Sequence, residues 1–215
     1  MKKWTAVLCA LLMTCLAATA LAEAPVSNLY RPNLSETFKA LVGGKSFEAR
    51  ITGWESTGED EDAKFRITIT VCERDLFDPA AIENLAEHDI LSFGNGTSAM
   101  VMEVARDEYG VTVKDGFGNG YSFFKAEDGT AYLASTDTDY PFYTDIFTVT
   151  VPLEKDISFL DWSDPENLDE PVKRGFDELL ALIQEGTEFA PYNTRVTFDE
   201  NGKLVEFLYN YSPWN

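Results

Sequence analysis

The stretch KFRITITVCER, residues 64–74, alternates between apolar and polar side chains along nearly its whole length. Phe65, Ile67, Ile69 and Val71 fall on one side of this alternation, and arginine and threonine fall on the other. Successive side chains of a β-strand point to opposite faces of the sheet, whereas an amphipathic helix repeats every three to four residues. The stretch therefore predicts a strand with one buried face.

The same alternation, bounded by turn residues, returns along the rest of the chain. Further strands are expected at 47–54, 90–93, 99–105, 111–114, 121–125, 131–135, 146–153 and 203–211. Several connections carry hairpin signals, such as Asn201-Gly202, which suits a turn with positive φ. About ten strands with short connections predict a mainly β (α+β) protein, built as an antiparallel β-barrel or sandwich.

Three short to medium helices are expected between the strands, at 35–44, 78–87 and 170–186. Asp78 suits an N-cap and Pro79 suits the first helical position. The longest helix has apolar residues at helical spacing. These residues are Val172, Phe176, Leu179, Leu180 and Ile183. We expect this helix to pack across one end of the barrel or one face of the sheet.

Residues 1–22 have the features of a secretory signal peptide. Two lysines precede an apolar run, and the small residues at 20–22 fit a cleavage site. Cys15 is a poor site for lipid attachment, because threonine precedes it and the apolar run continues past it. No later run approaches the roughly 20 apolar residues that span a bilayer, so no membrane insertion is expected after cleavage. The sequence predicts a protein that is secreted or held in the cell envelope.

Residues 23–215 are expected to form a single β-rich domain. Its main strand region covers 46–153, a helical segment covers 164–186, and a C-terminal hairpin covers 193–211. The hairpin is expected to join the same sheet system, because an isolated hairpin is marginal in water. Signal cleavage leaves Cys72 as the remaining cysteine, so stability must come from packing and not from an internal disulfide.

The chain has a formal net charge of −20. Such a surface repels nucleic acid and anionic lipid headgroups and favours cations or basic partners. A simpler interpretation, that the charge keeps an exported protein soluble, stays open beside it. No nucleic-acid partner is expected, and a glycan or a basic protein is the kind of partner that fits.

The sequence carries no catalytic signature. Gly116, Gly118 and Gly120 precede a strand and not a helix, so they predict a β-turn and not a phosphate-binding loop. A dyad of Cys72 with His88, the single histidine, is disfavoured because Cys72 falls within a strand, away from the helix N-termini that lower thiol pKa values. Zinc needs clustered histidines or cysteines. No catalytic residue, metal ligand or cofactor is therefore assigned.

Abundant carboxylates leave two alternative functions open. A secreted glycan hydrolase could use two of them across a sugar-binding cleft. A calcium-binding domain outside the EF-hand class could use them as ligands. Residues 137–148 begin as an EF-hand loop does, but they have Phe142 where glycine is required and Thr148 where glutamate belongs.

The loop STDTDYPFYTD, residues 135–145, supplies the candidate site. The candidate binding residues are Asp137, Asp139, Tyr140, Tyr143 and Asp145. The tyrosines offer flat faces to a sugar or a basic peptide, and the aspartates accept hydrogen bonds or gather a cation. In the alternative interpretation the loop is a structural lid, with Phe142 and Tyr140 filling the end of a barrel. The predicted function is that of an exported acidic binding or interaction protein.

Overall fold

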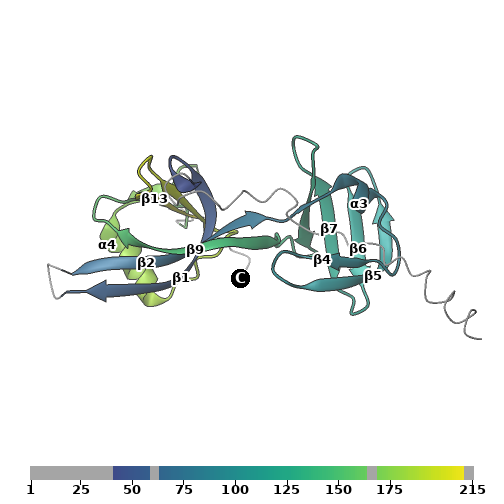
Figure 1. The fold of residues 1–215 in the computed structure, drawn as a ribbon, viewed down its shortest axis with the longest axis horizontal. Helices are drawn as coiled ribbons and strands as arrows, with labels where there is room; N and C mark the ends of the chain where they lie inside the picture. Colours follow the sequence, from purple (N-terminus) through teal and green to yellow (C-terminus); the bar gives the residue numbers. More distant parts are fainter. Residues whose placement is uncertain (1–40, 59–62, 164–168, 211–215) are drawn as a thin grey trace, which may run out of the picture.

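The computed structural model of the chain describes residues 41–58, 63–163 and 169–210. The signal peptide predicted over 1–22, with Cys15, and most of the helix predicted over 35–44 lie outside these residues. Within the described ranges, no helix is long and apolar enough to cross a membrane. The protein is mainly β, as the alternation predicts, and its strands form two separate sheets (Figure 1).

The first sheet contains seven strands and lies on the left in Figure 1. Its order is β11 (Val172–Arg174), β10 (Ser158–Asp161), β13 (Leu204–Tyr209), β12 (Thr194–Phe198), β1 (Ser46–Thr57), β2 (Lys64–Arg74) and β9 (Tyr143–Leu153). Neighbouring strands are antiparallel except β10 and β13, which run parallel. The C-terminal hairpin of β12 and β13 belongs to this sheet through the pairing of β12 with β1.

The second sheet contains six strands and lies on the right in Figure 1. Its order is β3 (Leu76–Phe77), β8 (Tyr132–Thr136), β7 (Gly120–Lys125), β6 (Val111–Asp115), β5 (Ser98–Arg106) and β4 (Ile90–Ser92). The helix α3 (Pro79–Glu83) follows β3 and is capped by the Asp78 side chain. This sheet is an insertion within the first one, because Arg74 and Tyr143, where the chain leaves and returns, are register partners.

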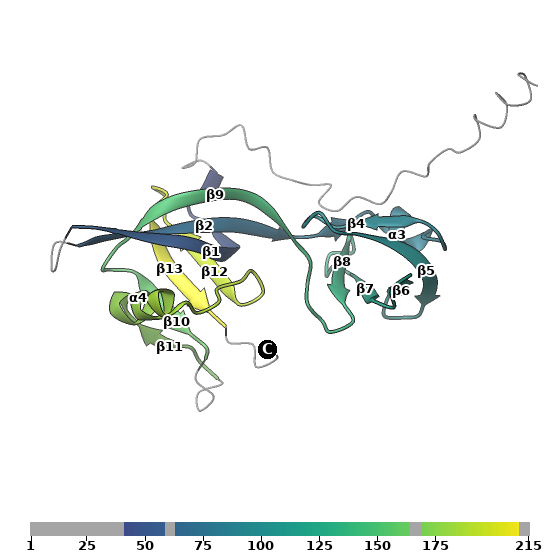
Figure 2. The same ribbon diagram turned by 90° about the horizontal axis from the view of Figure 1, so that it is seen from below.

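Each sheet has its own hydrophobic core. In the first core, Ile67, Ile69 and Val71 of β2 lie in one cluster with the apolar side of α4 (Phe176–Glu185), where Leu179 is fully buried. Figure 2 shows this sheet curving from β9 round to β10 and β11, with α4 beside them. The buried face of β2 is therefore the one that the alternation predicts.

The second core is rich in phenylalanine. Phe77 and Phe123 meet edge to face with ring centroids 5.2 Å apart, and Phe93 and Phe142 stack at 4.0 Å. This cluster shares no residue with the first core. Whether the two sheets behave as the single domain expected for residues 23–215 stays a prediction.

The structure corrects part of the predicted fold. The strands form two sheets, one of them a half-barrel, so the expected barrel or sandwich of about ten strands is confirmed only in part. The described residues contain two helices, α3 and α4, instead of three, although residues 41 and 42 are helical. The longest helix begins at Phe176 and not near 170, because Gly175 is extended and residues 172–174 pair with β10. Val172 therefore belongs to a strand and not to the helical stripe.

The glycine-rich segment at 116–120 forms the turn between β6 and β7. The Asp115 side chain accepts hydrogen bonds from the backbone N–H of Phe117 and of Asn119, both at 2.8 Å. Gly118 has φ +87°, a conformation that other residues rarely adopt. The glycines therefore build a hairpin turn between two strands, as predicted.

Candidate functional site

A cleft of about 830 Å³ lies between the two sheets. Its walls come from β1, the β4–β5 turn, the loop between β8 and β9, and the segment between α4 and β12. The lining residues most relevant to binding are Arg50, Trp54, Tyr140, Tyr143, Glu188 and Tyr192. A large, mostly apolar cleft with a few polar groups is the default location of a ligand site.

The strand β1 supplies Arg50 and Trp54. Its register with β2 shifts between Ile51 and Gly53, which marks a β-bulge. At this point the N–H of Ile51 donates to the carbonyl of Phe189, on the segment after α4, at 3.2 Å. Trp54 is 44% exposed, so the strand presents a large aromatic surface in the cleft.

The segment between α4 and β12 is held by a buried asparagine. The side-chain oxygen of Asn193 accepts from the N–H of Ala190 at 2.8 Å, and its amide nitrogen donates to the carbonyl of Glu188 at 3.2 Å. Buried polar groups that are satisfied in this way rigidify a loop. The segment therefore presents Glu188 and Tyr192 to the cleft in a fixed arrangement.

The loop between β8 and β9 joins the two walls. The N–H of Thr136 donates to the carbonyl of Tyr140 at 2.9 Å, and its hydroxyl accepts from the N–H of Tyr140 at 3.1 Å. Phe142 is buried in the second core. Tyr140 instead meets Tyr192 of the opposite wall edge to face, with ring centroids 5.6 Å apart. The loop thus combines a buried anchor with an aromatic contact across the cleft.

The structure brings together some of the predicted site residues and leaves others apart. Tyr140 and Tyr143 both line the cleft. Asp145 does not line it but forms an ion pair with Arg50, which does. Asp137 and Asp139 are exposed in the turn and are not part of the lining.

The alternation of the sequence does not single out Arg50, Trp54 or Tyr192. A signal for Trp54 is the glycine before it, which interrupts a strand pattern and indicates a bulge. A signal for Tyr192 is its neighbour Pro191. The same pairing of proline with tyrosine in a connecting segment occurs at Tyr140 and Pro141. Neither signal shows that these residues meet in space.

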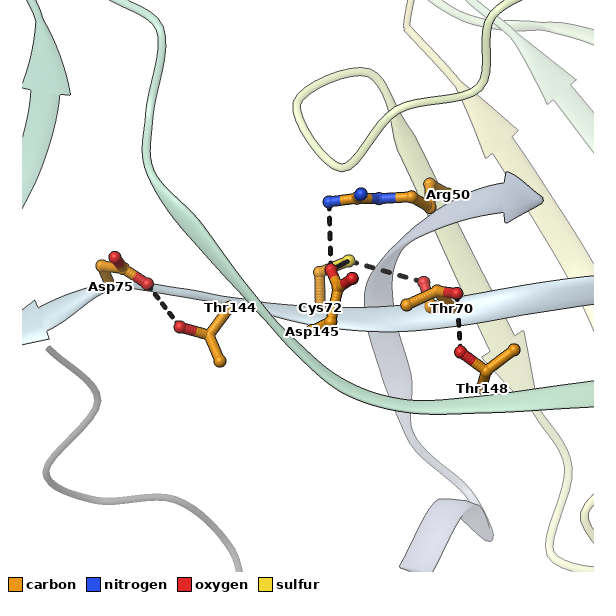
Figure 3. Close-up of polar contacts among 7 residues, drawn as sticks. All are labelled: Arg50, Thr70, Cys72, Asp75, Thr144, Asp145 and Thr148. Carbon is orange, nitrogen blue, oxygen red and sulfur yellow. Dashed lines mark hydrogen bonds and ion pairs between the residues drawn. The ribbon is translucent and has the colours of Figure 1, made fainter. Parts of the chain in front are cut away.

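A polar cluster lies beside the cleft on β1, β2 and β9 (Figure 3). Arg50 Nη2 lies 3.0 Å from Asp145 Oδ1, and Cys72 Sγ donates to the same oxygen and to the carbonyl of Thr70, both at 3.5 Å. Burial raises the pKa of the Cys72 thiol to about 12, although Arg50 opposes this. The thiol is therefore protonated at neutral pH, where it is a poor nucleophile and a poor metal ligand.

Burial also affects the groups around Tyr143. It raises the pKa of the Glu48 carboxyl, although Arg74 and Arg195 oppose the shift. It raises the pKa of the Tyr143 phenol, and the nearby Glu48 carboxylate adds to the effect. The Tyr143 hydroxyl therefore stays neutral at physiological pH and keeps its ability to donate a hydrogen bond.

Asp75 links the two chain connections between the sheets. It is 1% exposed, and its carboxylate accepts from the Thr144 hydroxyl at 2.7 Å and from the N–H of Gly94 (Figure 3 shows the Thr144 bond). Its own N–H donates to the carbonyl of Phe142 at 2.9 Å. A Cβ at Gly94 would overlap the Thr144 side chain. We call Asp75, Gly94, Phe142 and Thr144 the clamp.

The described residues that line the cleft suit recognition of a ligand by apolar contact and hydrogen bonding. Glu188 is the one carboxylate among the described residues that line the cleft. Across the ranges that the structure describes, no group of three or more His, Cys, Asp or Glu could hold a metal ion. Cys72 lies on the first sheet, and His88 lies in the turn before β4 of the second.

Comparison with known proteins gives no relative for this chain. No protein-family model, no curated protein and no solved structure matches it.

Proposed function

We propose that the chain is an exported binding protein that holds a neutral glycan segment in the cleft between its two sheets. The observation that carries this proposal is the convergence of Trp54, Tyr140 and Tyr192 on one cleft. Aromatic rings combine a flat apolar face with, in tyrosine and tryptophan, a polar group that can hydrogen-bond. A sugar ring has the matching surface, with apolar C–H faces and hydroxyl edges.

The charge of the cleft supports an uncharged ligand. Arg50 and Glu188 are the charged side chains among the described lining residues, and Arg50 is already paired with Asp145. The cleft is thus close to neutral in a chain with a net charge of −20. A basic peptide is drawn to complementary negative charge, which lies elsewhere on the surface. The neutral Tyr143 hydroxyl adds a donor for a sugar oxygen.

Binding accounts for this lining better than hydrolysis does. Glycoside hydrolysis uses two carboxyl groups roughly 5 to 10 Å apart across the scissile bond. The described lining offers Glu188 and no second carboxylate. Asp137 and Asp139, which could gather a cation, are exposed outside the cleft, so calcium binding is not part of this proposal.

The test is calorimetric titration of residues 23–215 with a panel of neutral oligosaccharides. We expect Trp54→Ala to weaken binding about tenfold or more, because a stacked ring is lost, which corresponds to ~1.4 kcal/mol or more. Trp54 is partly exposed, so the variant should stay folded. Tyr109→Ala is the matched control, since Tyr109 is an 80% exposed aromatic outside the cleft, and it should bind as the unmodified protein does.

Two results would contradict the proposal. One is the absence of binding to every neutral oligosaccharide of the panel. The other is an equal loss of affinity in Trp54→Ala and Tyr109→Ala. Turnover of a glycan that is abolished by Glu188→Gln would instead assign the chain to the hydrolases.

A further inference from the structure

A second surface feature lies on the second sheet, outside the cleft. Ile90, Met100, Met102 and Phe117 are 46%, 53%, 40% and 94% exposed, and none of them lines the cleft. We call these four residues the methionine patch. Single exposed apolar side chains are ordinary, but a contiguous group of large ones marks an interaction surface.

The four residues are contiguous. Ile90 of β4 and Met100 of β5 are register partners. The register of β5 with β6 shifts at Met102, which is the extra residue of a bulge. The Met102 side chain reaches to within 3.7 Å of the position that a Cβ would take at Gly116, next to Phe117. The patch therefore runs from β4 across β5 to the β6–β7 turn.

The methionines do not serve the core of their own sheet. Ala99 and Val101, which alternate with Met100 and Met102 along β5, are 4% and 0% exposed and belong to the second core. Strand geometry places Met100 on the opposite face. The cost of exposing long apolar side chains there is thus not offset by packing within the described part of the chain.

The surroundings of the patch are acidic. Exposed Glu87 and half-buried Asp89 lie just before Ile90 in the chain, and Glu103 follows Met102 and pairs with Lys114 at 3.2 Å, so the net charge beside the patch is negative. A second copy of this chain, or an anionic lipid surface, would bring negative charge against this region and be repelled. A basic partner would gain from the same field.

We propose that the methionine patch docks a basic polypeptide segment with an apolar face, such as an amphipathic helix. Methionine side chains are flexible and polarisable, and they adapt to different apolar partners. The apolar face of the segment would cover the four patch residues, and its basic residues would lie over the surrounding acids, as in other helix-docking surfaces. This surface is separate from the cleft and does not depend on the function proposed for it.

The experiment measures the anisotropy of a labelled synthetic peptide of leucine and lysine whose leucines fall on one helical face. We expect it to bind the chain, and a peptide with glutamate in place of lysine not to bind. Met102→Glu should weaken binding about tenfold or more. Ser56→Glu adds the same charge at an exposed position of β1 and should change the affinity by less than about twofold. Trp54→Ala should leave peptide binding intact.

Other outcomes would overturn the proposal. If Met102→Glu and Ser56→Glu changed the peptide affinity equally, the peptide would be recognising only the overall negative charge of the protein. A dimer in sedimentation that Met102→Glu dissociates would make the patch an interface between copies of this chain. Met102-dependent binding to vesicles of anionic phospholipid, without binding of the peptide, would make it a membrane-contact surface. A Met100→Ser, Met102→Ser double variant removes apolar surface without adding charge. It must weaken binding of the peptide as well, or the patch is not the docking surface.

Discussion

At the scale of single residues, Cys72 makes the stability of the protein depend on alkaline pH. Burial raises the pKa of its thiol from 9.0 to about 12. As the pH rises, the thiol therefore loses its proton at a lower pH in the unfolded chain than in the folded protein. The stability contributed by the neutral thiol is complete below about pH 9 and is lost as the pH rises toward 12. We expect the free energy of unfolding to fall over this window, as measured by urea denaturation.

Variants separate the contribution of Cys72 from that of its neighbour Tyr143. Cys72→Ala should reduce the decrease in the free energy of unfolding between about pH 9 and 12. At neutral pH it should lower the free energy of unfolding by about 1 kcal/mol, because a buried side chain is lost. Tyr143→Phe is the comparison, since burial raises the pKa of this phenol as well. An alkaline slope that is identical in Cys72→Ala and the unmodified protein would contradict the role of the thiol.

At the scale of elements, the clamp fixes how β2, β9 and the β4–β5 turn meet. Asp75→Ala would leave the buried Thr144 hydroxyl and the N–H of Gly94 without this acceptor. Hydrogen bonds to a charged group contribute about 1.5 to 3 kcal/mol each, so we expect a loss of roughly 3 kcal/mol or more in urea denaturation.

An exposed carboxylate with similar bonds gives the matched control for the clamp. Asp128 accepts from the N–H and the hydroxyl of Thr130, at 3.0 and 2.8 Å, in an exposed turn. Water replaces these bonds when the side chain is removed, so Asp128→Ala should lower the free energy of unfolding much less than Asp75→Ala does. Equal losses of unfolding free energy in Asp75→Ala and Asp128→Ala would mean that burial does not strengthen the hydrogen bonds of the clamp.

Elements with a long repeating pattern were predictable, and short ones were not. The strand β2 has the predicted bounds, because eleven residues are enough for a period of two to appear. The strands β10 and β11 have four and three residues, too few to show a period. Val172 also falls at helical spacing from Phe176, so its pairing with β10 overrides a local pattern that favours helix.

The candidate site was predictable only where it is local in sequence. Tyr140 and Tyr143 lie three residues apart in the segment 135–145 that the sequence singles out, and both line the cleft. Trp54 and Tyr192 lie far apart along the chain and reach the same cleft because β1 pairs with β12. Sheet order and curvature arise from non-local pairing, which hydrophobic periodicity does not encode.

At the scale of the whole molecule, two cores share one chain. The second sheet is inserted between β2 and β9, so the chain passes between the sheets twice, once on each side of the insertion. Asp75 lies on the first connection, and Phe142 and Thr144 flank the return to β9. Both connections therefore run through the clamp, so we expect coupling between the cores to depend on it.

The final prediction concerns the cooperativity of unfolding, measured by differential scanning calorimetry of residues 23–215. If the clamp couples the sheets into one domain, the unmodified protein unfolds in one transition whose calorimetric and van't Hoff enthalpies agree. Asp75→Ala should then separate it into two transitions, because each sheet keeps its own core. Two transitions in the unmodified protein would show two domains. A single, lower transition in Asp75→Ala would mean that other contacts, such as Tyr140 with Tyr192, suffice to couple the sheets.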